Sequence, residues 1–176
     1  MQRWALVMAI ACYPGALVAQ GGGADSVTPA ARAQQDLWIS AGIGEGGAAR
    51  TGDGLGAMAS GWYAYGPYVA GVRASAAGPF FGPGTRDKAA LVGLRARSTH
   101  AFVLFGVGAG TLSGARSNGE QSGSETVFPD LVSIAYGAEA SVNYKVIGIG
   151  LDLFGAVAGR TSYTGLAMSI QLGYLK

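Results

Sequence analysis

The stretch LVSIAYGAEASVN, residues 131–143, alternates apolar side chains with small or polar ones at every second position. One face would carry Val132, Ile134, Tyr136, Ala138, Ala140 and Val142, and the other Ser133, Ala135, Gly137, Glu139 and Ser141. A period of two predicts a β-strand with two unlike faces. Its 13 residues exceed the roughly 5–6 that are usual in soluble sheets. They are enough to cross a bilayer at a tilt, which takes about 9–11 residues.

Seven further segments share this period and a similar length. Together they predict eight strands, at about residues 36–45, 54–65, 67–77, 87–97, 100–112, 131–143, 145–155 and 164–175. No segment among them shows the helical period of about 3.6 residues. The sequence therefore predicts an all-β fold.

The connections between these segments alternate in length. Short turns are predicted at Gly66-Pro67, Ser98-Thr99 and Tyr144-Lys145, and longer loops at about residues 46–53, 78–86, 113–130 and 158–163. Transmembrane barrels of the outer-membrane type have short periplasmic turns and longer external loops. The pattern predicts an antiparallel up-and-down barrel over residues 36–176, with both of its ends on the periplasmic side.

Composition also favours a membrane environment. Only 12% of the 176 residues are charged, and 31 are glycine, whereas a soluble domain carries roughly 25% charged residues. No interior segment has the about 18 consecutive apolar residues that a transmembrane helix needs, which leaves the closed barrel as the spanning structure. The net charge of +2 is diffuse, unlike the clustered basic surface of a nucleic-acid-binding protein.

The N-terminus has the layout of a secretory signal peptide. Residues 1–3 form a short region made positive by Arg3, residues 4–11 are apolar, and small residues follow. We expect residues 1–19 to be removed, with cleavage possible as late as residue 24. A lipidated Cys12 is the alternative, because residues 9–12 loosely resemble a lipoprotein box. Residues 20–35 are small and polar, and we expect a disordered periplasmic segment there.

The barrel portion resembles the small eight-stranded outer-membrane proteins of the OmpA transmembrane domain and OmpX type. The resemblance covers about residues 36–176 and consists of the strand pattern. It implies a bacterial outer-membrane location, lipid as the surroundings, and recognition by the outer-membrane assembly machinery. In that family the chain usually ends on an aromatic residue, whereas here Tyr174 is followed by Leu175-Lys176.

Four charged residues fall on the predicted inward face: Arg73, Arg95, Glu139 and Asp152. The interior of an eight-stranded barrel is just wide enough for side chains to fill it, and buried charges are costly unless they are paired. We therefore predict an interior ionic network in which the two arginines bridge to the two carboxylates and plug the barrel. A gated polar path for small ions is the functional alternative.

Aromatic residues gather near the predicted periplasmic ends of the strands. They are Tyr63, Tyr65, Tyr68, Tyr144 and Tyr174. Tyrosine favours the interface between membrane and water because its ring is apolar and its tip polar. We expect these side chains to form an interfacial girdle.

The sequence offers no catalytic, cofactor or metal site. The GxGxxG match at residues 42–47 is followed by loop sequence rather than by the helix that a dinucleotide site requires. His100 is the only histidine, and it lies at a predicted short turn without a neighbouring acid, so neither a triad nor a zinc site is expected.

The function that these features favour is a non-enzymatic outer-membrane barrel with a structural or surface-interaction role through its external loops, whose partner is unknown. Two alternatives remain open at this point. One is a narrow channel for ions or small solutes. The other is a soluble lipocalin-like carrier, which would place its apolar face inward.

Overall fold

The computed structural model describes residues 35–48, 52–78, 84–117 and 125–174. These residues form eight strands: β1 (Gln35–Ala48), β2 (Gly52–Tyr65), β3 (Tyr68–Gly78), β4 (Thr85–Arg97), β5 (Ala101–Ser117), β6 (Glu125–Tyr144), β7 (Ile147–Ala158) and β8 (Thr161–Tyr174). The predicted all-β fold class is confirmed. Within the described ranges, no helix is long and apolar enough to cross a membrane.

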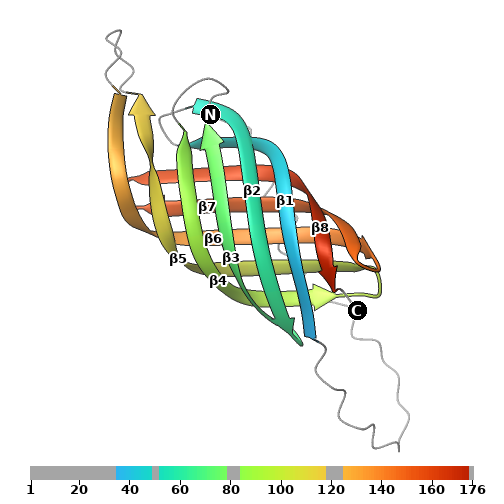
Figure 1. The fold of residues 1–176 in the computed structure, drawn as a ribbon. Helices are drawn as coiled ribbons and strands as arrows, with labels where there is room; N and C mark the ends of the chain where they lie inside the picture. Colours follow the sequence, from blue (N-terminus) through green and yellow to red (C-terminus); the bar gives the residue numbers. More distant parts are fainter. Residues whose placement is uncertain (1–34, 49–51, 79–83, 118–124, 175–176) are drawn as a thin grey trace, which may run out of the picture. The chain divides into compact units, whose positions relative to one another are not determined.

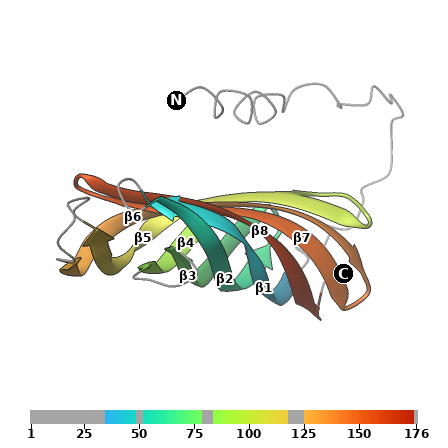
Figure 2. The ribbon, with the colours of Figure 1, turned by 90° about the horizontal axis from the view of Figure 1, so that it is seen from above.

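The strands close into a barrel. Each strand pairs antiparallel with the next, and β8 pairs with β1. Figure 1 shows the strands side by side in chain order, and the view in Figure 2 shows the sheet curving back so that β8 meets β1. The closing seam runs from the Leu37–Tyr174 pair to the Ala48–Tyr163 pair.

The last hairpin corrects one predicted connection. The loop expected at residues 158–163 is a two-residue turn, because Ala158 pairs with Thr161 across Gly159 and Arg160. Gly159 adopts a φ of 58°, a left-handed conformation that glycine tolerates well in such turns. The prediction was wrong because Thr161 and Ser162 are polar, yet backbone pairing does not require an apolar face.

Two other predicted loops are also shorter than expected. β1 continues to Ala48 and β2 begins at Gly52, while β5 continues to Ser117 and β6 begins at Glu125. The pairing of β5 with β6 persists to Ser117 and Glu125 after an irregularity between Leu112 and Gly114. In both hairpins the alternation of apolar and small residues ends before the backbone pairing of the two strands does.

Several predictions concern residues outside the described ranges. They are the signal peptide at residues 1–19, its later cleavage limit at residue 24, Cys12, and the tip of the longest loop at residues 118–124. Of the segment expected to be disordered, only Gln35 is described, and it is the first residue of β1.

Interior aromatic side chains lie over glycines of the neighbouring strand. Trp62 pairs with Gly71 and Phe154 with Gly165. A Cβ atom added at either glycine would collide with the facing aromatic ring. The inward glycines therefore provide the room that large side chains need inside so narrow a barrel.

Candidate functional site in the barrel interior

The four charged residues predicted to face inward are buried. Arg73 of β3, Arg95 of β4, Glu139 of β6 and Asp152 of β7 are each at most 5% exposed. Asp36 and Asp87 are buried as well, each at 1%, and neither was among the predicted inward charges. The described interior therefore holds four buried acids and two buried arginines.

Arg73 forms an ion pair with Asp87 on the adjacent strand. Its Nη2 lies 2.7 Å from Oδ2 of Asp87. The same guanidinium donates from Nη1 to the backbone oxygen of Tyr136 at 2.6 Å and from Nη2 to that of Gly155 at 3.0 Å. Arg73 thus reaches across the barrel from β3 to β6 and β7, and its charge-assisted hydrogen bonds link four strands, β4 included.

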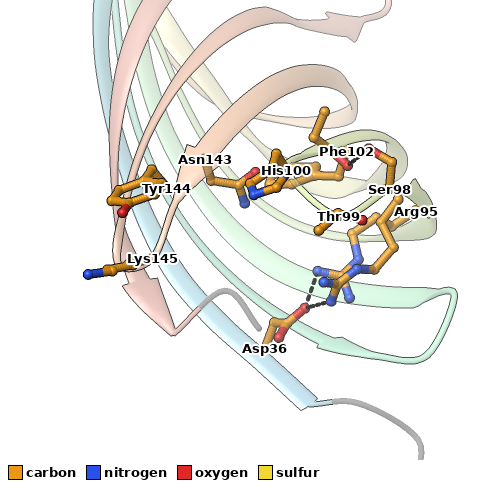
Figure 3. A pocket seen from close by; sticks show the side chains of 11 residues that line it. Asp36, Arg95, Ser98, Thr99, His100, Phe102, Asn143, Tyr144 and Lys145 are labelled. Atoms are coloured by element: carbon orange, nitrogen blue, oxygen red, sulfur yellow. Dashed lines mark hydrogen bonds and ion pairs between the residues drawn. The ribbon is translucent and has the colours of Figure 1, made fainter.

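Arg95 and Arg97 share the carboxylate of Asp36 at the end of the barrel that carries the short turns. Arg95 Nη1 lies 2.6 Å and Arg97 Nη1 2.9 Å from Oδ2 of Asp36, as the dashed lines of Figure 3 show. The guanidinium of Arg95 also lies 5.6 Å from the ring centroid of Trp38 and 5.9 Å from that of Phe102, within the range of cation–π attraction.

A small polar pocket of about 150 Å³ lies at this barrel mouth, bordered by Asp36, Arg95 and Arg97. His100, Asn143 and Lys145 also line it. Ser98, the nearby hydroxyl in the turn, donates to the backbone oxygen of Ala101 at 3.3 Å. Because Asp36 binds two arginines and Ser98 stabilises its turn, the pocket has the character of a structural ionic cluster.

Glu139 and Asp152 face each other across β6 and β7 as a register pair. Gln171 Nε2 donates to Glu139, and Ser169 Oγ donates to Asp152. Ser141 Oγ in turn donates to Gln171 Oε1 at 2.5 Å. Neutral side chains of β8 therefore donate hydrogen bonds to both acids, and Ser141 of β6 holds Gln171 in place.

The observed contacts differ from the predicted pairing of Arg73 and Arg95 with Glu139 and Asp152. No ion pair within the described ranges joins these arginines to these two acids. The reason is proximity along the sheet: Asp87 lies on β4, next to Arg73 on β3, and Asp36 lies near the same barrel mouth as Arg95. The alternation of β4 could have identified Asp87. It is an even number of positions from Arg95 on the same strand, so both side chains point to the same face.

The interior leaves little free space. A cavity bordered by Trp62, Arg73, Glu139, Asp152 and Phe154 holds only about 10 Å³, roughly the volume needed for the centre of one water molecule. Among the described residues, no group of three or more histidine, cysteine or acidic side chains could hold a metal ion.

The outer face is apolar. Every second residue of the strands points outward, and large apolar side chains dominate that face, among them Ile39, Val132, Ile149 and Met168. Such an exterior matches hydrocarbon rather than water. It is the reverse of the arrangement expected for a lipocalin-like carrier.

The predicted tyrosine girdle can be located in part. Tyr63 and Tyr65 lie at the end of β2, Tyr68 at the start of β3 and Tyr144 at the end of β6, and all four side chains are exposed. Tyr174 is the last residue of β8, and its side chain lies outside what the structure describes. These strand ends adjoin the short turns.

Comparison with solved structures identifies similar barrels. Neisserial surface protein A (NspA) matches with a TM-score of 0.63 and 9% identity over 77% of this chain and 96% of that chain. Ail, the attachment invasion locus protein of Yersinia pestis, solved in complex with the heparin analogue sucrose octasulfate, matches with a TM-score of 0.59 and 14% identity over 80% of this chain and 99% of that chain. At these identities the likeness is one of fold, and it confirms the predicted resemblance as a resemblance of fold.

A second structure of Ail matches with a TM-score of 0.56 and 14% identity, over 79% of this chain and 98% of that chain. No family model matches the sequence, and no curated protein matches it.

Proposed function

We propose that this chain is a non-enzymatic barrel of the bacterial outer membrane that acts at the cell surface through its external connections. The observation that carries the proposal is the contrast between the two faces of the sheet. The exterior is apolar, whereas the interior is packed with ion pairs and aromatic rings around a cavity of only about 10 Å³. Such a barrel has a lipid-compatible surface and a closed lumen.

The packed interior favours this role over a narrow channel. Arg73 crosses the lumen to the backbone of β6 and β7, and Trp38, Trp62 and Phe154 are almost fully buried. An ion would have to displace a buried arginine from its carboxylate, which is costly. Conduction would therefore need a rearrangement of the side chains that stabilise the barrel.

The surface role rests on the longest hairpin and on the neighbours. β5 and β6, with 17 and 20 residues, are the longest strands, and long connections on a rigid scaffold are where binding commonly occurs. The structure of Ail was solved in complex with a heparin analogue, so a sulfated polysaccharide is a suitable first probe for this chain. We also propose that residues 1–19 direct export and that the assembly machinery inserts the barrel.

Two measurements test the proposal. The full chain is expected in the outer-membrane fraction, with a migration on detergent gels that changes on heating. Purified protein in planar bilayers is expected to give no discrete current steps. Recovery in buffer without detergent would contradict the membrane assignment, and steady single-channel currents would contradict the closed lumen.

A hydrolase screen on lipid substrates tests the non-enzymatic assignment. We expect no turnover above that of a His100→Ala variant. A lipid-hydrolase activity that is lost in the His100→Ala variant would overturn the non-enzymatic assignment.

A further inference from the structure

A groove of about 920 Å³ crosses the outer face of the barrel over five strands, β8, β1, β2, β3 and β4. Its floor consists of Ala41, Ala59 and Ala74, which are successive cross-strand partners on β1, β2 and β3. Because these alanines are neighbours across the sheet, their short side chains form one continuous depression, which is bordered by larger apolar residues such as Ile39, Val72 and Ile170.

A second row of partners deepens the groove. Ile39 pairs with Gly61, and Gly61 pairs with Val72. A Cβ atom at Gly61 would have ordinary contacts, 3.9 Å from Ile39 Cγ2 and 4.0 Å from Val72 Cγ2. The space above Gly61 is therefore open between two aliphatic walls, and a larger side chain could enter it without moving the backbone.

A cation closes one end of the groove. Lys88 is exposed, lines the groove and pairs across the sheet with Ala74. Arg86 lies two residues away on the same outward face. Within the described ranges neither cation has an ion-pair partner. The groove is therefore apolar along its length and carries a positive charge at one end. That charge has no acidic partner among the described residues.

The groove runs obliquely from one end of the barrel toward the other, and so across part of the membrane thickness. Lys88 lies near the start of β4, at the end of the barrel with the longer connections, whereas Leu172 lies near the opposite end of β8. The floor row from Ile170 to Lys88 spans four strand-to-strand steps, or about 19 Å at the usual strand spacing. One leaflet of hydrocarbon is about 15 Å deep, half of the bilayer core. Because the strands of such barrels tilt by about 35–45° from the barrel axis, a row perpendicular to them rises about 11–13 Å along that axis, which is most of the depth of one leaflet.

We propose that this groove holds one phosphorylated lipid of the outer leaflet, with an acyl chain along Ala41, Ala59 and Ala74 and its phosphate at Lys88. The site depends on the proposed outer-membrane location, because that location supplies lipid and orients Lys88 toward the external surface. The apolar floor would hold the acyl chain, and Lys88, which has no ion-pair partner among the described residues, would hold the charged headgroup.

Native mass spectrometry of the full chain in neutral detergent tests the site. The micelles receive equal amounts of phosphatidic acid and phosphatidylcholine with identical acyl chains. We expect one phosphatidic acid to remain bound in preference to phosphatidylcholine. Lys88→Gln should lower that preference about fivefold, the effect of one lysine near an anionic lipid surface, and Gly61→Leu should reduce retention of either lipid by filling the groove.

Two matched variants serve as controls. Lys145→Gln removes a cation at a short turn, and Ala96→Leu enlarges an outward alanine of β4 that does not line the groove; both should retain lipid like the parent chain. Equal loss in Lys88→Gln and Lys145→Gln, or equal retention of both lipids by the parent chain, would overturn the proposal. A dimer that Gly61→Leu dissociates would show a second copy as the occupant instead.

Every variant is first checked for recovery in the outer membrane and for heat-modifiable migration. If the parent chain fails that check, the proposed function fails. If it passes and shows no preference for phosphatidic acid, only the lipid site fails.

Discussion

The indole ring of Trp62 on β2 occupies the space above Gly71 on β3, its cross-strand partner. The two residues are matched in size, because a methyl group at position 71 would meet both the ring and the backbone oxygen of Gly61. Overpacking of this kind costs about 1–3 kcal/mol. We therefore expect Gly71→Ala to lower the free energy of unfolding by that amount in urea titrations of the reconstituted barrel.

Gly61 provides the control on the neighbouring strand. It points outward, and a Cβ atom there is free of close contacts, so Gly61→Ala should change the free energy of unfolding by less than about 0.5 kcal/mol. Equal destabilisation by both substitutions would contradict the role assigned to Trp62.

The buried pair of Arg73 and Asp87 supports a second prediction. Arg73→Met leaves the Asp87 carboxylate buried without its cation, and breaking such a pair costs about 3–5 kcal/mol. The double variant Arg73→Met, Asp87→Leu removes both charges and should recover much of that loss. Unfolding midpoints of the two single variants and the double variant complete the cycle; an additive result would show that the two side chains are not coupled.

A buried acid that binds arginines should respond differently to neutralisation from one that accepts hydrogen bonds from neutral side chains. Asp36 binds Arg95 and Arg97, so Asp36→Asn should destabilise the barrel by several kcal/mol, in the range for a broken buried pair. Glu139 accepts from Gln171 Nε2, and a glutamine carbonyl can accept the same bond, so Glu139→Gln should cost less than Asp36→Asn. Thermal unfolding followed by the heat-modifiable gel shift compares the two, and the reverse order would contradict the contacts described.

The orientation of the barrel can be measured at the two ends of β7. Arg160 lies in the turn after β7 and Val146 in the turn before it, and both are exposed. With a membrane-impermeant maleimide on intact cells, Arg160→Cys should react, and Val146→Cys should react only after the outer membrane is permeabilised. The parent chain corrects for any reaction of Cys12. The opposite pattern would reverse the assignment of the external side.

The strand pattern was predictable because the two faces of the sheet meet different surroundings. Alternation of apolar with small residues, as in Ala101 to Ala109 of β5 or Ile147 to Leu153 of β7, follows directly from lipid on one side and a narrow lumen on the other. Where both faces leave the hydrocarbon, this constraint ends. The sequence therefore shows no apolar alternation in the outer parts of β5 and β6 or at the start of β8, although the backbones there continue to pair.

The partners of the buried charges could not be read from the alternation. Parity tells which face a residue occupies, but not which inward residue lies at the same height on another strand. That height depends on the register and tilt of all eight strands. The pairing of Ser60 with Arg73 and of Ala74 with Lys88 became evident only from the closed sheet, and so did the contact of Arg73 with Asp87.

The seam between β1 and β8 joins residues from the two ends of the sheet, with Leu37 beside Tyr174. Its hydrogen bonds are the least local among the described strand pairings, so their closure has the largest entropic cost and is expected late. Until then, β1 and β8 each expose an unpaired edge, and such edges readily bind another strand. We expect the interval between synthesis and closure to be the stage at which this chain is most prone to aggregation, and folding to be slow in the manner of topologies dominated by non-local pairing.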